Sequence, residues 1–172
     1  LYDVKKYNSS KLDYKLPMIL GINKSRKAQF MDLYNAPHVL IAGATDSGKT
    51  TFIYSLISTL LYYKKPEELR FILIDLKRVD MPAIFQNLTH LLTEVITEPD
   101  KAISALKWTV GEMEHRYKKL SENGVRNIEE YNKIKEIEKL PYIVFIIDEL
   151  ADLMIFSPGE TEELITRLAQ LS

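Results

Sequence analysis

The sequence predicts an α/β fold, in which a parallel sheet is flanked by helices and preceded by a small β-hairpin. Three observations support this prediction. Strand-length apolar runs alternate with helix-length amphipathic segments, a glycine-containing loop joins one such run to a helix, and two of the runs end on acidic residues. Strands that alternate with helices are joined by right-handed crossovers, which make the strands parallel.

The first part of the chain contains a hairpin and the first strand–helix pair. Short apolar runs on either side of the polar residues 21–27 predict a β-hairpin within residues 11–35. The apolar run 38–42 predicts the first parallel strand. Residues 49–63 predict the helix that follows it, and Pro66 ends this helical region.

The middle of the chain repeats the pattern of strand and helix. Residues 70–75 form a continuously apolar run that closes on an acid, and such runs are typical of strands buried on both faces. A short helix is expected from Asp80, with Pro82 near its first turn. A further short strand is expected at 92–96.

The last part of the chain contains the longest helix, expected at 98–121 and ended by Asn123 and Gly124. A single apolar stripe runs along it at alternating steps of three and four residues, formed by Ile103, Leu106, Val110, Met113, Tyr117 and Leu120. Asn127 and Glu130 are spaced as an N-cap and its reciprocal partner, which predicts a helix to about residue 138. The remaining expected elements are a strand at 142–147 and a final helix at 160–170.

Composition limits the classes of protein. The chain has 172 residues, of which 46% are apolar and 27% charged, as in one soluble globular domain. No apolar run reaches the length of about 18 residues that a membrane span needs. The absence of cysteine excludes disulfides and cysteine-ligated metals, and it fits a reducing compartment.

Charge is distributed unevenly along the chain. Residues 1–35 carry seven lysines and arginines against three aspartates, whereas residues 140–172 carry one arginine against six acids. A net charge of −1 excludes a globally basic surface for DNA. Any contact with nucleic acid is therefore expected through local loops or through an assembly.

A complete phosphate-binding loop lies between the expected strand at 38–42 and the helix after it. Its residues are Gly43, Ala44, Thr45, Asp46, Ser47, Gly48, Lys49 and Thr50, with Thr51 next. Backbone N–H groups of such a loop surround phosphates, and the helix N-terminus adds the positive end of its dipole. Lys49 is expected to reach the terminal phosphates and the Thr50 hydroxyl to bind Mg²⁺. The alternative is a structural turn that resembles such a loop.

Asp148 and Glu149 directly follow the apolar run 142–147, and ligands of α/β sheets bind at the carboxyl ends of the strands. Asp148 is expected to bind Mg²⁺, directly or through water, and Glu149 to act as the base that activates the attacking water. The alternative is that the two acids only end a strand and cap the next helix. A glutamate directly after the metal-binding aspartate favours ATP hydrolysis over the chemistry of simple kinases and GTPases.

Several segments of the chain resemble the FtsK/SpoIIIE family of hexameric double-stranded DNA translocases. The resemblance extends over about residues 15–172, and its most specific segments are 108–117 and 148–154. The other matching segments are 36–43, 70–75, 90–95, 124–127 and 140–142.

The resemblance implies a RecA-like motor domain that forms a homo-oligomeric ring, a hexamer, around duplex DNA and hydrolyses ATP with Mg²⁺ between subunits. Residues 1–35 would be a basic segment and hairpin that pack on the motor core, residues 36–172. Such motors act in cell division and chromosome partition. They are cytoplasmic, at the cytoplasmic face of the inner membrane, and a region not present here would supply the membrane tether.

The chain departs from the family pattern at three places. Asp46 stands where the family usually has glycine, and an acid near phosphates is expected to weaken nucleotide binding. Lys77 follows Asp75 and Leu76 where the family has Asp-Pro-Lys, so it is either a residue near the γ-phosphate or a surface lysine. We also expect the native protein to continue beyond Ser172 into the next core strand, a DNA-contacting loop and a winged-helix module.

Two other functions remain open at this point. One is a coupling ATPase of conjugative DNA transfer or of type VII protein secretion. The other is a non-motor nucleotide-binding assembly module in which Asp46 has removed the activity.

Roles are also expected for two arginines, the tryptophan and the histidines. Arg167 is a candidate for an arginine that acts on a neighbouring subunit, with a surface role as the alternative. Arg116 is expected to pair with a glutamate on its own helix, and Trp108 to pack in the core. The three histidines lack the spacing of metal ligands.

Overall fold

The computed structural model describes residues 14–44, 46–78 and 80–170. The chain divides into two compact units, Leu1–Lys64 and Lys65–Ser172. The division expected at residues 35 and 36 stays a prediction. Among the described residues, no helix combines the length and the apolar character needed to cross a membrane.

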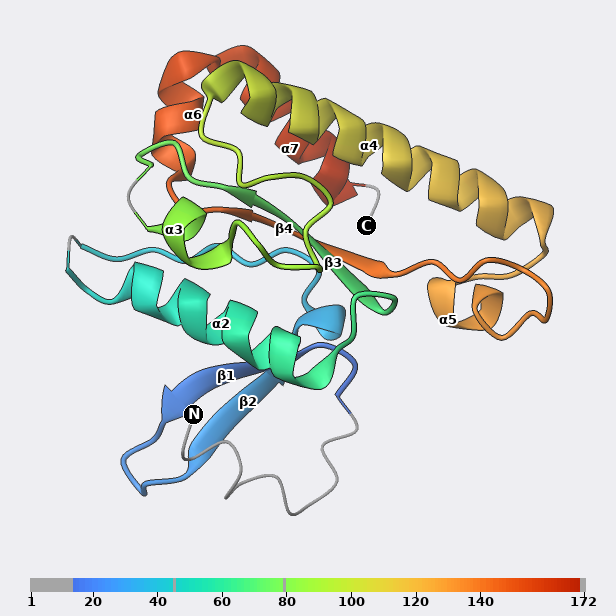
Figure 1. Cartoon of the computed structure of the whole chain (residues 1–172), viewed down its shortest axis with the longest axis horizontal. Coiled ribbons are helices and arrows are strands. Elements are labelled where there is room, and N and C mark those ends of the chain that lie inside the picture. Colours follow the sequence, from blue (N-terminus) through green and yellow to red (C-terminus); the bar gives the residue numbers. More distant parts are fainter. Residues whose placement is uncertain (1–13, 45, 79, 171–172) are drawn as a thin grey trace. The chain divides into compact units, whose positions relative to one another are not determined.

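The first unit begins with the expected hairpin. Strands β1, Pro17–Ile22, and β2, Ala28–Asp32, pair in antiparallel orientation, and a short 3-10 helix, Leu33–Asn35, follows them (Figure 1). The Asn23 side chain organises the turn between the strands, because its Oδ1 accepts hydrogen bonds from the N–H groups of Ser25 and Lys27. The hairpin prediction is confirmed.

The buried carboxylate of Asp32 anchors the hairpin to the chain that enters it. Its two oxygens accept from the backbone N–H groups of Lys15 at 2.9 Å, Leu16 at 2.8 Å and Tyr34 at 3.1 Å. Asp32 is only 6% exposed, and these bonds compensate the cost of burying its carboxylate.

Helix α2, Lys49–Tyr63, is the second part of this unit, and its bounds match the prediction. Its buried side chains form one face, consisting of Ile53, Leu56, Ile57, Thr59 and Leu60. Strand β1 packs against this helix, and Met18 is 1% exposed. Burial of these side chains supplies the core of the unit.

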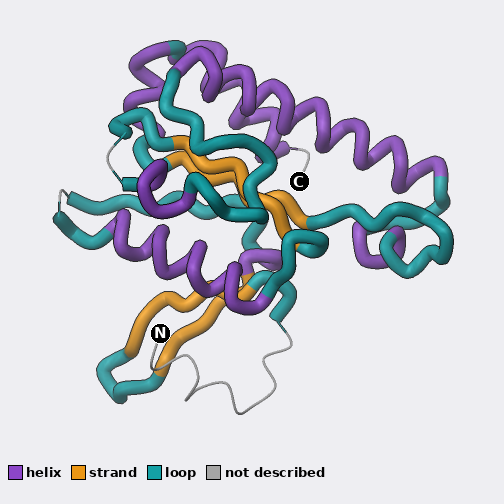
Figure 2. Tube along the Cα trace, in the orientation of Figure 1, coloured by secondary structure: helices purple, strands orange, loops and turns teal. Residues whose placement is uncertain are grey.

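The prediction of a strand at 38–42 is wrong for this structure. Residues 36–44 form no helix or strand and run as a loop into α2 (Figure 2). The described strands belong to two sheets, β1–β2 and β3–β4, and neither includes these residues. A strand requires hydrogen bonds to a neighbouring strand, and Leu40, which is 81% exposed, has no such neighbour in the described chain.

The second unit is built on a parallel pair of strands. Strand β3, Leu69–Ile74, pairs with β4, Tyr142–Ile147, residue for residue from the first pair to the last. On the other side of β3, single bridges join Phe71 to Leu91 and Ile74 to Ile96. The strand expected at 92–96 is therefore reduced to isolated bridges that flank β3.

The other regular elements described in the second unit are helices. They are α3, Met81–Phe85; α4, Pro99–Glu122; α5, Ile128–Tyr131; α6, Leu150–Phe156; and α7, Pro158–Gln170 (Figure 1). Helix α4 packs against α6 and α7. The core between these helices and the strands contains Ile72, Ile74, Ile96, Ala102, Ile103, Leu106 and Leu153. A parallel sheet with flanking helices is what the sequence predicts.

Three details differ from the expectations. Trp108 is 48% exposed and does not pack in the core. Of the apolar stripe along α4, Ile103, Leu106 and Val110 are buried, whereas Tyr117 is 46% exposed. The helix expected to residue 138 ends at Tyr131, although Asn127 caps it as predicted. Helix α6 was not predicted, because its seven residues are too few to display a helical period.

Candidate functional site

The described residues on either side of position 45, namely 43–44 and 46–48, form a turn at the start of the long helix α2. Asp46 has φ 59° and Gly48 φ 94°, both in the left-handed region, and Ser47 N–H donates to the Ala44 carbonyl at 3.2 Å. A side chain at Gly43 would collide with Ser47. The described residues thus contain a turn and two left-handed positions directly before α2, as a phosphate-binding loop requires. Phosphate binding by this loop stays a prediction.

Lys49 is the first residue of α2 and folds back over the loop. Its ammonium donates to the carbonyl of Gly43 at 2.6 Å and to that of Ala44 at 2.9 Å. The cation therefore lies against the backbone of residues 43 and 44, which precede the helix N-terminus. Positive charge and unpaired N–H groups in one place are what a phosphate group requires.

The structure describes two of the three threonines in and directly after the loop. Thr50 is half-buried and Thr51 is exposed, both in the first turn of α2. Thr45 lies outside the described residues. The role of Thr50 as a Mg²⁺ ligand stays a prediction.

Within the second unit, Asp75 and Asp148 follow the last paired residues of β3 and β4. The strands end on the pair Ile74 and Ile147, and Asp148 N–H donates to the Ile74 carbonyl at 3.1 Å. Two parallel strands in this register carry the next residue of each chain to the same edge of the sheet. The acids that the sequence places 73 positions apart are neighbours here.

Asp75 is buried, at 2% exposed, and its carboxylate is used by the backbone. It accepts from the N–H groups of Asp80 at 3.3 Å and Met81 at 3.2 Å, at the start of α3. Asp75 therefore closes the turn between β3 and α3. The predicted site does not include Asp75. Its place directly after a buried strand is the feature of the sequence that could have indicated a position at this edge of the sheet.

The electrostatic environment of Asp148 is unfavourable to its negative charge. Burial raises the pKa of Asp148, and the charges of Asp75, Glu149 and Asp80 raise it further, while Lys77 acts in the opposite direction. Asp148 therefore lies where an added cation is stabilised by several carboxylates.

Glu149 forms an ion pair with Lys77. The Lys77 ammonium donates to Oε2 of Glu149 at 3.1 Å, and this hydrogen bond is the main reason that the pKa of Lys77 is raised. Glu149 occupies the N-cap position of α6, yet its carboxylate makes no capping bond to the helix. Lys77 is thus a partner of the predicted base.

The donor chemistry of this edge fits Mg²⁺, the ion that the phosphate loop implies. Mg²⁺ prefers oxygen ligands and is usually held by one or two carboxylates together with phosphates and water. Among the described residues, no group of three or more histidines, cysteines, aspartates or glutamates could hold a metal alone. Asp148, whose charge is opposed by its acidic neighbours, is a carboxylate that such an ion would stabilise.

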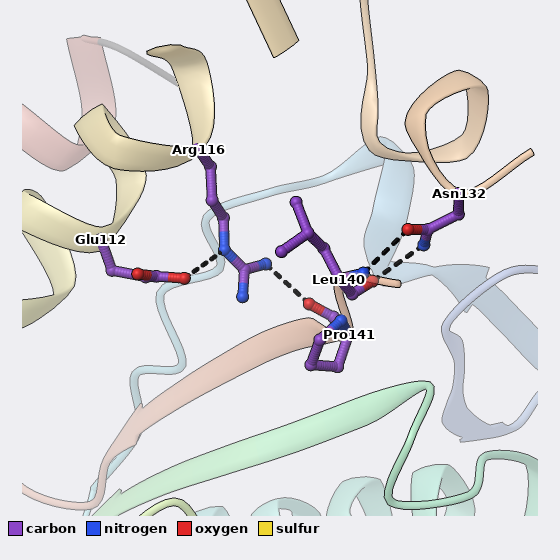
Figure 3. Close-up of polar contacts among 5 residues, drawn as sticks. All are labelled: Glu112, Arg116, Asn132, Leu140 and Pro141. Atoms are coloured by element: carbon purple, nitrogen blue, oxygen red, sulfur yellow. Dashed lines mark hydrogen bonds and ion pairs between the residues drawn. The ribbon is translucent and has the colours of Figure 1, made fainter. Parts of the chain in front are cut away.

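Arg116 supports the far end of β4 (Figure 3). Its guanidinium donates to Glu112 on the same helix at 2.6 Å and to the Pro141 carbonyl at 2.6 Å. The Asn132 side chain bonds both the N–H and the carbonyl of Leu140, at 2.8 Å each. The predicted pairing of Arg116 with a glutamate of its own helix is confirmed, and the contact to Pro141 is new.

Arg167 pairs with Glu114 of α4. The pair joins α7 to α4 within the second unit, and both side chains are about half exposed (53% and 46%). A role of Arg167 in a neighbouring subunit stays a prediction.

Comparison with known proteins identifies similar sequences over nearly the whole chain. The model of the FtsK/SpoIIIE family matches residues 1–172. The DNA translocase FtsK of Clostridium tetani is 50% identical over 161 residues, which cover 91% of this chain and 22% of that protein. The DNA translocase FtsK of Chlorobaculum tepidum is 47% identical over 165 residues, which cover 91% of this chain and 20% of that protein. The chain thus spans about a fifth of the length of these relatives.

Solved structures with the same fold include two further kinds of protein. The pCW3 conjugation coupling protein TcpA, in its monomer form with ATPγS, is 30% identical with a TM-score of 0.68, covering 92% of this chain and 43% of that one. The cytoplasmic domain of the type VII secretion ATPase EccC of Thermomonospora curvata is 23% identical with a TM-score of 0.78, covering 95% of this chain and 21% of that one. These neighbours are motor domains with a phosphate loop, so the fold class predicted from the sequence is confirmed.

Proposed function

The chain belongs to the FtsK/SpoIIIE family, and we propose that it is the ATP-hydrolysing motor part of a double-stranded DNA translocase. The observation that carries the proposal is the loop at the start of α2, where left-handed Asp46 and Gly48 and the folded-back Lys49 form a phosphate site. Relatives that share 47–50% of the residues in this region are named DNA translocases.

In this proposal the phosphates of ATP bind to residues 43–51. The N–H groups of the loop and of the first turn of α2 contact the phosphate oxygens, and the Lys49 ammonium leaves its carbonyl partners for the β- and γ-phosphates. The hydroxyl of Thr50 and the carboxylate of Asp148 would hold Mg²⁺, which would neutralise charge on the phosphates when bound.

Glu149 acts as the general base. Its carboxylate accepts a proton from a water molecule while the water oxygen forms a bond to the γ-phosphorus. The bond between the γ-phosphorus and the bridging oxygen breaks, and the electron pair stays on ADP. The proposal requires that the loop and the two acids meet around one nucleotide.

The partner of the motor is duplex DNA, and its working form is a ring of identical subunits, a hexamer in the family. The net charge of the sequence is −1, with basic and acidic segments at its two ends, so DNA contact is assigned to loops and to the assembly. We place the motor in the cytoplasm, at the inner membrane, with a role in chromosome partition during cell division.

The decisive experiment measures ATP hydrolysis by the full-length protein with and without duplex DNA. We expect DNA to stimulate the rate, and Glu149→Gln to lower kcat by about a hundredfold or more while ATP binding persists, because the amide cannot accept the proton. Gln170→Glu, at an exposed position on α7, is the control and is expected to behave like the wild type. Hydrolysis that persists in Glu149→Gln, or that duplex DNA does not stimulate, contradicts the proposal.

A second candidate is a coupling ATPase of conjugative transfer. The observation that favours it is the likeness to the pCW3 coupling protein, at 30% identity and a TM-score of 0.68. A type VII secretion ATPase would share the same motor, and here the likeness supports the fold alone. In the experiment above, stimulation by a relaxosome or a secreted substrate in place of free duplex DNA would favour one of these two.

A further inference from the structure

We propose that Lys77 is a positioning residue for Glu149, holding its carboxylate in an ion pair that must open before Glu149 can act as a base. This inference rests on the proposed function of Glu149. It goes beyond that function, because it assigns a role to a lysine that has none in the proposed reaction.

The first observation is that the carboxylate of Glu149 prefers a distant partner to a local one. Acids at a helix N-cap normally accept from the N–H groups of the first turn. Glu149 is at the N-cap of α6 and makes no such bond, and its Oε2 instead accepts from Lys77, which lies 72 positions earlier in the chain.

The second observation is that the turn carrying Lys77 is fixed. The buried Asp75 accepts from the N–H groups of Asp80 and Met81, and the Asp75 N–H donates to the Ile96 carbonyl at 2.9 Å. Arg78 N–H donates to the Asp75 carbonyl at 3.2 Å. These hydrogen bonds restrict the backbone around Lys77, which lies near the end of β4. The positions that the Lys77 ammonium can reach are therefore limited.

The third observation concerns charge. The charges of Asp152 and Asp148 add to that of Glu149 in keeping Lys77 protonated. An ammonium that donates to a carboxylate oxygen occupies a lone pair of that oxygen, and a general base needs a free lone pair to accept the proton of water. The ion pair thus fixes the direction of the Glu149 carboxylate and, while it is closed, keeps that carboxylate from accepting a proton from water.

The exposure of the pair makes it easy to open. The side chain of Lys77 is 52% exposed and that of Glu149 34%. Ion pairs in such positions stabilise weakly, because water solvates both charges when they separate. The restraint on Glu149 is therefore small, and its removal should change rates by a few-fold rather than by orders of magnitude.

The first test compares Lys77→Met, Lys77→Arg and the wild type in the ATPase assay of the full-length protein. Without DNA, Lys77→Met should raise kcat by about two- to fivefold, the range of an exposed ion pair, with KM for ATP within about twofold. Lys77→Arg keeps the charge and should restore the wild-type rate. The control Lys107→Met removes a lysine from another exposed ion pair, with Glu160 at 2.5 Å between α4 and α7, and should leave kcat unchanged.

Each outcome of this test is informative. An unchanged or lowered kcat in Lys77→Met overturns the inference. The double variant Lys77→Met/Glu149→Gln should be inactive, since the added rate comes from Glu149. Failure of the proposed function would look different, because the single Glu149→Gln variant would then keep its activity.

A second test does not depend on catalysis. These 172 residues contain no cysteine, so Glu149→Cys introduces the one thiol of this region, whose reaction rate with a thiol reagent is followed by mass spectrometry of the peptide that carries it. A nearby ammonium favours the reactive thiolate, so Glu149→Cys should react several-fold faster than Lys77→Met/Glu149→Cys. Addition of Mg²⁺ and ATPγS should abolish this difference. Equal rates without nucleotide, or a difference that nucleotide leaves intact, would overturn the inference.

Discussion

Two apolar runs of similar character behave differently in this molecule. Residues 69–74 form β3, in which Leu69, Phe71, Leu73 and Ile74 are all 0% exposed, whereas residues 38–42 form no strand and Leu40 is 81% exposed. Both runs are rich in branched apolar residues, so composition does not explain the difference.

The difference lies in what surrounds each run. Strand β3 has β4 on one side and the bridges at Leu91 and Ile96 on the other. Residues 38–42 have no ladder in the described chain. Strand propensity measures how well a side chain suits a paired and half-buried surface. Branched apolar residues therefore stabilise a strand only where a neighbouring strand is present.

The largest expected effect comes from the core of β3. Phe71→Ala should lower the free energy of unfolding of the second unit by about 3–5 kcal/mol, because it leaves a cavity at a fully buried site. Urea denaturation followed by fluorescence measures this, since Trp108, the single tryptophan, lies in the same unit.

Leu40→Ala is the matched change in the other run. It should alter the unfolding free energy by less than about 0.5 kcal/mol, because the side chain is exposed. Hydrogen exchange should be fast at 38–42 and slow at 69–74. A large cost at Leu40, or slow exchange around it, would show that this run is a paired strand in solution.

The next effect concerns the start of β4. Arg116→Ala removes the hydrogen bonds to Glu112 and to the Pro141 carbonyl and leaves both acceptors half-buried. A loss of about 2 kcal/mol in unfolding free energy is expected, since hydrogen bonds of charged groups contribute more than neutral ones.

Arg167→Ala provides the comparison for Arg116, because its pair with Glu114 is about half exposed. Its cost in the same urea titration should be about 1 kcal/mol or less. Equal costs for the two arginines would mean that the Pro141 contact does not hold β4.

A change of about the same size as that at Arg167, but in ligand binding rather than in stability, is expected in the loop after residues 38–42. Asp46→Gly relieves a left-handed aspartate at φ 59° and removes an acid near the phosphates. ATP should bind about fivefold more tightly, the effect of one unit charge a few ångströms away in water, as measured by calorimetry.

Asp46→Asn separates the two causes, since asparagine also tolerates left-handed backbone but carries no charge. If the charge matters, both variants should bind more tightly. Unchanged affinity in both would show that Asp46 does not oppose nucleotide binding.

The same contrast explains what the sequence could and could not predict. Helix α2 and strand β4 were predicted to the residue, and β3 within one, because periodicity, glycine and proline mark them locally. The turn at Asp46 was foreseen in the loop motif. The failure at 38–42 is a failure of pairing, which is not a local property of a sequence.

The missed features of the site are also non-local. Asp75 appears in the sequence as a strand end, and only the register of β3 with β4 brings it beside Asp148. The Lys77–Glu149 pair depends in the same way on two segments far apart in the chain. The short α5 ends where Asn132 turns to bond Leu140, a tertiary contact that no helical pattern encodes.

The parallel register also separates the parts of this protein that can change length from those that cannot. One residue inserted into β3 or β4 would shift one acid by about 3.3 Å and turn the following side chains to the opposite face. Residues inserted between Tyr131 and Leu140 would leave Asp75 and Asp148 side by side, provided that Arg116 still holds Pro141. This connection can therefore change in length while the two acids remain neighbours at the edge of the sheet.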